Sequence, residues 1–388
     1  MEQATAAPNI GVEEFLALPE GAAHVIDVRS RMDAAYGLIP GALVCPLDEI
    51  WETLPPNDGK IFIVYCKHGA ISEGAAAQMR EKGYDARNLE GGYLAWLMET
   101  MRREDDAALR QRVDNSIQKK FRHRLWTRFA RAIKNYRLVN EGDCIGVCIS
   151  GGKDSMLMAK LFSQFQKYSD VPFTVHYIVM DPGYSAENRK VIEDNARKLG
   201  IPIEIFETDI FESVYNIEKN PCYLCARMRR GYLYSYAKSL GCNKIALGHH
   251  YDDVIETILM GMLYGAQVQT MMPKLHSKNF PGMELIRPLY LIREDDIKKW
   301  RDSNDLHFIQ CACKFTDTCS TCGGENTSKR VEVKNLIRQL KETNPFVESN
   351  IFKSVENVNL STVIAYKQGG VKHHFLDDYD KVEKKEEA

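Results

Sequence analysis

Short apolar runs separated by amphipathic stretches give the first hundred residues an alternating pattern of strands and helices. His24–Val28 and Ile61–Tyr65 are compact apolar runs rich in β-branched residues, which is typical of buried parallel strands. Between Ser72 and Lys82, apolar residues recur at helical spacing, and this segment stops before Gly83. The pattern predicts a small α/β domain over residues 1–100.

A second alternating pattern begins near residue 141 and predicts a larger α/β domain over residues 141–345. Helical segments of similar length separate its apolar runs, and this order favours a doubly wound parallel sheet. The predicted strands are Cys144–Ile149, Phe173–Val179, Ile203–Phe206 and Lys244–Leu247. Residues 346–388 follow as a C-terminal extension that ends in a charged tail.

The two patterns are joined by a helical, basic linker, residues 101–140. Residues 97–140 contain no glycine or proline, and residues 115–140 contain no acid. Apolar residues three to four positions apart give this helical stretch one apolar face, and the cations lie between them. The stretch is a candidate RNA-binding surface, and a solvated helix face is the alternative. The candidate RNA-binding residues are Lys119, Lys120, Arg122, Arg124, Arg128 and Arg131.

Composition narrows the class of protein. With 44% hydrophobic and 27% charged residues, the chain can bury substantial cores. It has no apolar run near the ~18 residues of a membrane span, and its N-terminus lacks a signal-peptide pattern. We therefore expect a cytoplasmic protein with no membrane partner. The net charge of −2 means that any nucleic-acid site must be a local patch.

The eleven cysteines suggest sulfur or metal chemistry rather than a disulfide framework. Four of them, Cys45, Cys144, Cys148 and Cys242, stand in apolar surroundings and are predicted to be core residues. The others occur alone after a strand, as a CxxC pair, or in one dense cluster. These are Cys66; Cys222 and Cys225; and Cys311, Cys313, Cys319 and Cys322.

A glycine-rich loop follows the strand CIGVCI directly and precedes an apolar helix. Its backbone N–H groups and the helix N-terminus can hold phosphate, and its lysine adds a charge. The spacing of its glycines differs from that of a Walker A loop. The candidate phosphate-binding residues here are Ser150, Gly151, Gly152, Lys153, Asp154 and Ser155.

The loop SGGKDS resembles the signature of the PP-loop ATP pyrophosphatases. The segment CYLCARMRRGYLYSYAKSLGCNKIALGHHYDDVIETILMGMLYG resembles the tRNA 2-thiocytidine synthetase family, and the resemblance covers roughly residues 115–360. It implies an ATP-dependent tRNA sulfurtransferase that forms AMP and pyrophosphate. Such an enzyme adenylates C2 of a pyrimidine, here cytidine 32 of the anticodon loop, and replaces the oxygen with sulfur.

The resemblance also implies roles for individual residues. Asp154 would help to position Mg²⁺ and pyrophosphate, so that it counts as catalytic. Asp253 could instead be a plain acid at a helix N-terminus, together with Asp252 and Glu256. Further ATP-binding candidates are Met180, Asp181, Gly248, His249 and Asp253.

Cys222 and Cys225 would hold a [4Fe-4S] cluster with one later cysteine, as the resembling family does, and would take part in catalysis. We assign Cys311 as the third ligand, with Cys322 or Cys313 as the alternative. This stretch departs from the family's compact PCxxCG by about eight extra residues. A zinc knuckle at the CxxC pair and a separate Zn²⁺ among Cys311–Cys322 remain open.

The segments DVR at 27–29, GLIPGA at 37–42, CKHGA from Cys66 and LEGGYLAW at 89–96 resemble a single-domain rhodanese. The resemblance spans residues 9–100 and implies that Cys66 carries a persulfide. Backbone N–H groups of residues 67–71 and a helix N-terminus would stabilise this anion. Ile71 stands where that family usually has arginine, so a cysteine desulfurase or other persulfide donor is favoured over thiosulfate.

The expected macromolecular partner is tRNA, and a homodimer is left open. Thiolation of a tRNA uridine or of a small metabolite is the alternative within the enzyme class. An iron–sulfur protein for sulfur trafficking or redox sensing is the alternative outside it. The intact SGGKDS and GHHYDD motifs weigh against the latter.

Overall fold

The computed structural model describes residues 8–19, 21–103, 106–210, 221–309, 329–377 and 379. Its packing divides the chain into two compact units. The first comprises residues 1–252 and 272–328, and the second comprises residues 253–271 and 329–388. The first unit holds all the predicted strands of both α/β patterns. The domain boundaries suggested by the sequence stay a prediction.

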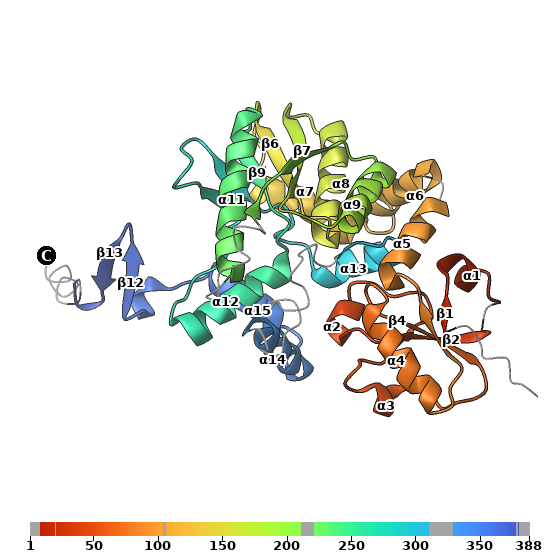
Figure 1. The fold of residues 1–388 in the computed structure, drawn as a ribbon. Helices are drawn as coiled ribbons and strands as arrows, with labels where there is room; N and C mark the ends of the chain where they lie inside the picture. The colour runs from red at the N-terminus through yellow and green to blue at the C-terminus, as the bar shows by residue number, and fades with distance from the viewer. Residues whose placement is uncertain are drawn as a thin grey trace, which may run out of the picture. The chain divides into compact units, whose positions relative to one another are not determined.

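The N-terminal domain is built on a five-stranded, fully parallel sheet of order β1-β5-β4-β2-β3 (Figure 1). The strands are β1 (Asn9–Ile10), β2 (Ala23–Asp27), β3 (Leu43–Val44), β4 (Ile61–Tyr65) and β5 (Ala86–Leu89). The helices are α1 (Val12–Leu16), α2 (Arg31–Ala34), α3 (Ile50–Thr53), α4 (Ala70–Glu81) and α5 (Gly92–Arg103). The predicted small α/β domain is confirmed.

The basic stretch is helical but is not one continuous helix. It comprises α6 (Asp106–Gln118), a π-helical turn η1 (Arg122–Trp126) and α7 (Thr127–Asn135). Leu109, Val113 and Ile117 of α6 are buried in the core. The predicted apolar face of the following segment is also buried, as Phe121, Leu125, Phe129 and Ile133 show. The stretch is therefore packed structure with an exposed cationic side.

The larger domain has a six-stranded sheet of order β10-β11-β9-β6-β7-β8. Its strands are β6 (Cys144–Ile149), β7 (Thr174–Asp181), β8 (Ile203–Glu207), β9 (Lys244–Ala246), β10 (Lys274–His276) and β11 (Glu284–Ile286). All neighbours are parallel except β10, which runs antiparallel to β11 at the edge. The four predicted strands are confirmed, and the antiparallel edge is an addition that many doubly wound sheets carry.

Helices cover both faces of this sheet (Figure 1). Ile145 and Val147 pack in the core that also contains apolar residues of α8 and α9, whereas Cys148 packs with residues of α11. This alternation along β6 is what a strand buried on both faces requires. The helices of the domain are α8 (Lys153–Tyr168), α9 (Ala186–Leu199), α11 (Pro221–Ser239) and α13 (Glu294–Ser303).

The second unit contains most of α12 (Tyr251–Gly265), followed by α14 (Lys329–Thr343) and α15 (Val347–Ser354). A 3₁₀ turn, η2 (Leu360–Thr362), precedes an antiparallel hairpin of β12 (Ala365–Gln368) and β13 (Val371–His374). Among the described residues, no helix combines the length and apolar character needed to cross a membrane.

Candidate active site

The glycine-rich loop lies between the end of β6 and the start of α8, as the sequence predicted. Gly151 has a φ of +83°, and a Cβ atom placed on it would lie 2.6 Å from Cγ1 of Ile192 and 2.8 Å from Cδ1 of Ile309. Only glycine fits this conformation and this space. The turn therefore brings the backbone of the loop directly to the N-terminus of α8, which is a ready anion site.

The two serines of the motif fix the shape of the loop. Oγ of Ser155 accepts a hydrogen bond from the backbone N–H of Ser150 at 3.1 Å and donates one to the carbonyl oxygen of Gly152 at 3.0 Å. A Cβ on Gly248 would lie 3.2 Å from the backbone nitrogen of Ser155. The loop after β9 thus approaches the start of α8 closely, and the structure brings these predicted residues together.

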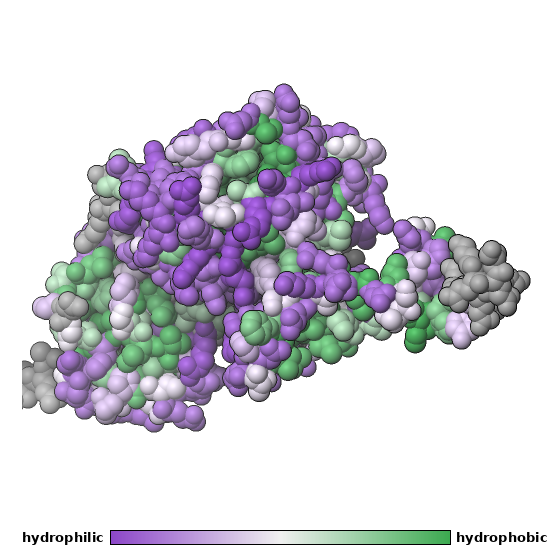
Figure 2. All heavy atoms as spheres, turned by 180° about the vertical axis from the view of Figure 1, so that it is seen from behind, coloured by the Kyte–Doolittle hydropathy of each residue, from purple (hydrophilic) through white to green (hydrophobic). Residues whose placement is uncertain are grey.

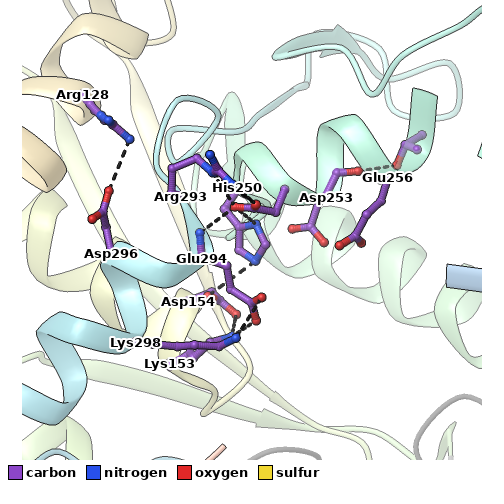
Figure 3. A network of polar contacts seen from close by, with 12 residues as sticks. Arg128, Lys153, Asp154, His250, Asp253, Glu256, Arg293, Glu294, Asp296 and Lys298 are labelled. Carbon is purple, nitrogen blue, oxygen red and sulfur yellow. Dashed lines mark hydrogen bonds and ion pairs between the residues drawn. The ribbon is translucent and has the colours of Figure 1, made fainter. Parts of the chain in front are cut away.

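Lys153 is buried, with 4% of its side chain exposed, and is surrounded by carboxylates. Its Nζ lies 3.0 Å from Oδ2 of Asp154 and 3.2 Å from Oε1 of Glu294 (Figure 3). Burial alone would lower the pKa of Lys153, but Asp154 and Glu294 outweigh it, so the pKa is raised. The ammonium stays charged and is held within this network.

Asp154 has one carboxylate oxygen without a hydrogen-bond partner among the described residues. Its Oδ2 contacts Lys153, whereas its Oδ1 is buried and accepts no hydrogen bond from the residues that the structure describes. Nε2 of His250 lies 3.9 Å from that Oδ1. A buried carboxylate oxygen without a donor is costly, and a cation satisfies it. The arrangement fits a Mg²⁺ ion beside the phosphate loop.

A second ion pair anchors the loop after β9 to the start of α13. Arg293 donates to Asp252, with Nη2 2.9 Å from Oδ1, and the backbone N–H of Glu294 donates to Oδ2 of Asp252 at 2.7 Å. Glu294 in turn contacts Lys153. Asp252 therefore links the GHHYDD motif to the network around the phosphate loop. Our sequence reasoning missed Arg293, Glu294 and His250, and the acid-rich helix start after Arg293 was the available signal.

Asp253 and Glu256 lie in the second unit, where both contact the same guanidinium. Nη1 of Arg330 donates to Oδ1 of Asp253 at 2.7 Å and lies 3.6 Å from Oε2 of Glu256. The assignment of Asp253 to ATP stays a prediction, because this contact gives its carboxylate a structural partner.

Met180 and Asp181 end β7, as predicted, and both are buried. Oδ1 of Asp181 accepts hydrogen bonds from the backbone N–H groups of Gly183 at 2.8 Å and Tyr184 at 2.7 Å. Asp181 thereby shapes the loop after β7. The backbone N–H of His249 donates to the carbonyl of Leu247. Roles for Met180, Asp181 and His249 in binding adenosine remain predictions.

The side chains of the predicted cluster ligands lie outside the part of the chain that the structure describes. Positions 222 and 225 lie in the first turn of α11, three residues apart, but the side chains of Cys222 and Cys225 lie outside the described part of the structure. Cys311, Cys313, Cys319 and Cys322 also lie outside the described residues. The predicted cluster and the alternative zinc sites there stay predictions.

Cys66 lies directly after β4, at the mouth of the loop that leads into α4. Its Sγ accepts a hydrogen bond from the backbone N–H of Gly69 at 3.2 Å and lies 3.4 Å from Oγ of Ser72. The one hydroxyl proton of Ser72 is shared between this sulfur and Oδ1 of Asn88, which lies 2.7 Å from the same Oγ. Cys66 is 4% exposed, and its sulfur faces these donors.

A cavity of about 220 Å³ opens onto Cys66, and we call it the sulfur-carrier pocket. Its walls include Arg29 and Ile71 of the N-terminal domain and Phe308 and Ile309 of the larger domain. Nε of Arg29 donates to Oδ1 of Asp27 at 2.9 Å, and that carboxylate outweighs burial and raises the pKa of Arg29. Ile71 is 53% exposed, so an apolar side chain stands at the rim where the resembling family usually has an arginine.

The wall shared by the two domains reaches the phosphate loop. Ile309 lines the sulfur-carrier pocket, and its Cδ1 lies 2.8 Å from the position that a Cβ atom on Gly151 would take. Nζ of Lys153 lies 5.2 Å from the centre of the Tyr36 ring, and Arg301 donates to the carbonyl oxygens of Ala35 and Tyr36. These contacts hold the loop after α2 beside the phosphate loop.

The six candidate RNA-binding residues lie on the exposed side of the basic stretch. Lys119, Lys120, Arg122, Arg124 and Arg131 are exposed, and Arg128 is half-buried. Arg124 and Arg128 contact the carboxylate of Asp296 at 3.8 and 3.3 Å, and Lys120 donates to Oγ of Ser303. On the face drawn in Figure 2, hydrophilic residues predominate over the larger domain. Part of this charge is therefore balanced within the protein.

Fold and site together define a PP-loop enzyme joined to a rhodanese-like domain. The model of the PP-loop domain family matches residues 122–315, and that of the rhodanese-like domain matches residues 12–99.

Curated relatives identify the particular family. The chain is 35% identical to the tRNA-cytidine(32) 2-sulfurtransferase of Alkalilimnicola ehrlichii over 59% of this chain and 71% of the relative. It is 33% identical to that of Alcanivorax borkumensis over 68% of this chain and 93% of the relative. The chain belongs to the family of the tRNA-cytidine(32) 2-sulfurtransferases, with a rhodanese-like domain at its N-terminus. It is an ATP-dependent sulfurtransferase.

Two solved structures are also similar to parts of the chain. The U34-tRNA thiolase NcsA from Methanococcus maripaludis with its [4Fe-4S] cluster is 22% identical, with a TM-score of 0.47, over 59% of this chain and 76% of that one. A rhodanese-like domain protein from Staphylococcus aureus is 30% identical, with a TM-score of 0.22, over 23% of this chain and 91% of that one.

Proposed function

We propose that the protein thiolates C2 of cytidine 32 in tRNA, using ATP, with sulfur relayed from Cys66. The observation that carries this proposal is the wall shared by the two sites. Cδ1 of Ile309 fills the space where a side chain on Gly151 of the phosphate loop would lie, and Ile309 also lines the sulfur-carrier pocket that opens onto Cys66. One residue thus separates a site for activating a substrate from a site for carrying sulfur.

The phosphate loop binds ATP for the adenylation that activates the pyrimidine. The C2 oxygen of the pyrimidine attacks the α-phosphorus of ATP, and pyrophosphate leaves with the electron pair of the broken P–O bond. Backbone N–H groups at residues 151–155 and the N-terminus of α8 offset the charge on the phosphates. Mg²⁺, held at Oδ1 of Asp154, would supply further charge neutralisation. Lys153 orients Asp154 through their 3.0 Å contact.

The N-terminal domain supplies sulfur. A protein persulfide gives its outer sulfur to the Cys66 thiolate, which is a redox-neutral thiol–persulfide exchange. Two electrons from a dithiol reductant then cleave the S–S bond of the Cys66 persulfide and release its outer sulfur as hydrosulfide beside the larger domain. Attack of hydrosulfide on C2 releases AMP. The donors at Gly69 and Ser72 hold the anionic sulfur in place.

Cys222, Cys225 and Cys311 are the proposed ligands of a [4Fe-4S] cluster, with Cys322 or Cys313 as alternatives for the third. Thiolates are the ligands that such clusters take, and the two CxxC positions share the first turn of α11. A cluster held by three cysteines supplies an iron with an open coordination site. The cysteines of 311–322 not used in this way remain candidates for Zn²⁺.

The exposed cations of the basic stretch are the proposed tRNA contacts. Five of the six are exposed, and the apolar residues between them are buried, so these charges face solvent. Contacts to phosphates would hold the anticodon loop, whose unpaired bases cost little to unstack. A tRNA uridine is the second candidate substrate, since C2 of uracil offers the same oxygen.

We expect the side chain at position 71 to determine which kind of sulfur donor the N-terminal domain accepts. Replacing Ile71 by arginine should raise thiosulfate:cyanide sulfurtransferase activity about tenfold, because a cation beside Cys66 adds about 1.4 kcal/mol of binding to the transition state of an anionic donor. Sulfur uptake from a cysteine desulfurase should not rise. Initial rates with each donor measure both effects.

Leu47→Arg is the matched control, since Leu47 lines the same pocket and is 44% exposed but lies outside the Cys66 loop. Equal gains in both variants would attribute the effect to net charge and remove the argument from Ile71.

The proposed reaction is tested by its product. Protein reconstituted anaerobically with iron and sulfide should form 2-thiocytidine in bulk tRNA given ATP, Mg²⁺ and a persulfide donor, as nucleoside mass spectrometry detects. Cluster-free protein serves as the control and should be silent. A thiouridine instead would change the target, and release of AMP without any thionucleoside would exclude tRNA as the sulfur acceptor.

A further inference from the structure

Three side chains with soft or nitrogen ligand atoms meet on the larger domain, away from the phosphate loop. Cys144 is the first residue of β6, His176 is the third of β7, and Cys242 precedes β9 by two positions. Because these strands are parallel, the group lies at their amino ends, whereas the phosphate loop follows their carboxyl ends. Neither activation of tRNA nor sulfur relay uses these residues.

The distances match a metal centre. Sγ of Cys144 and Sγ of Cys242 are 3.5 Å apart, and one ligand atom from each of the three residues lies within 4.8 Å of the others. A tetrahedral Zn²⁺ with Zn–S bonds of about 2.3 Å separates two sulfurs by about 3.8 Å, and a sulfur and a nitrogen by about 3.6 Å. Small side-chain movements would complete this geometry.

The surroundings hold the three residues in position. The backbone N–H of Cys144 donates to Oδ1 of Asn243, and the N–H of Asn243 donates to the carbonyl of Cys144, both at 2.9 Å. These two bonds fix Cys242 beside Cys144. Gly146 is paired with His176 across the sheet, and a Cβ on it would lie 3.7 Å from Sγ of Cys242. The absence of a side chain there keeps the space between the strands open.

The histidine already has the partner that metal-binding histidines usually have. Its Nδ1 lies 2.7 Å from Oε1 of Glu204 on β8. A carboxylate at one ring nitrogen fixes the tautomer and the ring orientation and leaves Nε2 to bind a metal. Cys242 is 4% exposed, whereas the side chain of His176 is 32% exposed, so water can reach the fourth position.

We propose that Cys144, Cys242 and His176 bind one Zn²⁺ ion, with Glu204 positioning His176 and water as the fourth ligand. Two thiolates and an imidazole are a donor set that zinc prefers over magnesium or calcium. The site would join β6, β7 and the turn before β9, which form the centre of the sheet, and would stabilise the domain when filled. This inference does not depend on the proposed reaction.

The test measures zinc in the full chain, with the other cysteines left in place. After loading with Zn²⁺ and dialysis, wild-type protein should retain one ion per chain more than Cys144→Ser or His176→Ala, as elemental mass spectrometry measures. Cobalt loading should show thiolate-to-cobalt absorption that is weaker in these variants than in wild-type protein. Glu204→Gln should bind zinc about 10–100-fold more weakly, as loss of such a partner does elsewhere.

Cys148→Ala is the matched control, because Cys148 is buried on the same face of β6 but is not part of the group. Burial raises its thiol pKa to about 12, and it should keep the wild-type zinc content when replaced. His176→Ala changes a half-exposed side chain, so it tests the site even if Cys144→Ser fails to fold. Equal zinc in wild-type and His176→Ala protein, or a Cys144–Cys242 disulfide in place of metal, would overturn the proposal.

Discussion

Replacing Cys66 by serine should abolish tRNA thiolation from a protein persulfide, while thiolation from inorganic sulfide and the formation of AMP continue. The loss with the persulfide donor should reach the background of the assay, because serine cannot carry sulfane sulfur. Cluster assembly should be unchanged, since the proposed cluster ligands lie in the larger domain. Thionucleosides and AMP measured side by side, with each sulfur source, give the result.

The different results expected with persulfide and with inorganic sulfide follow from the position of the sulfur-carrier pocket. Its wall includes Phe308 and Ile309, and the proposed ligand Cys311 is two residues beyond Ile309. A tethered carrier delivers sulfur at an effective concentration of about millimolar, so free sulfide at a similar concentration should replace it. At lower sulfide the Cys66→Ser variant should fall behind wild-type protein supplied with persulfide.

Cys45→Ser is the control for this experiment. Cys45 is buried in the same domain, with Sγ 3.5 Å from the carbonyl oxygen of Thr53, and it does not line the pocket. The Cys45→Ser variant should still relay sulfur from the protein persulfide to tRNA. Normal thiolation from persulfide by Cys66→Ser would show that the N-terminal domain is bypassed, and equal loss with sulfide would show that the substitution disturbs the larger domain.

Local sequence signals predicted the framework because they reflect local physics. Ile61–Tyr65 forms β4 at the predicted residues, since an apolar β-branched run suits a strand buried on both faces. Gly151 and Cys66 were identifiable for a similar reason. A left-handed glycine between a strand and a helix, and a cysteine directly after a strand, mark their sites within a few residues.

The contacts that join distant segments could not be predicted in this way. Arg293 and Asp252 are 41 positions apart, and Cys144 and Cys242 are 98 apart. Each pair depends on how the strands are ordered in the sheet, which periodicity does not specify. Cys144 and Cys242 were therefore predicted only as core residues, and half-exposed His176 carried no signal of its own.

The structure of the basic linker was also predicted only in part. Its charge pattern predicted one amphipathic helix, and the apolar face is indeed buried, but a π-helical turn interrupts it at Arg122–Trp126. Composition also could not show that Asp296 would contact two of its arginines, Arg124 and Arg128. We therefore expect Asp296 of α13 to weaken the proposed RNA contacts of these two arginines.

Asp154→Asn should lower the rate of tRNA-dependent AMP formation by about 10²–10³-fold, the usual cost of removing one preorganised electrostatic group. Asparagine keeps the size of the side chain but removes the negative charge that we propose binds Mg²⁺ at the unsatisfied Oδ1. A Cys66 persulfide should still form, because the sulfur-carrier site does not include Asp154. Release of AMP and pyrophosphate, followed together with the mass of Cys66, measures both activities in one preparation.

The position of Asp154 beside buried Lys153 makes a second explanation testable. Asparagine also weakens the 3.0 Å contact to the Lys153 ammonium, so the loss could come from a displaced loop rather than from a missing metal ligand. Asp154→Glu retains the negative charge. A raised Mg²⁺ concentration should therefore restore much of the rate of Asp154→Glu, but little of the rate of Asp154→Asn. Asp114→Asn, which removes a carboxylate 2.8 Å from Lys160 on α8, should remain active. If Mg²⁺ fails to separate the two Asp154 variants, the carboxylate acts by shaping the loop and the ion is bound elsewhere.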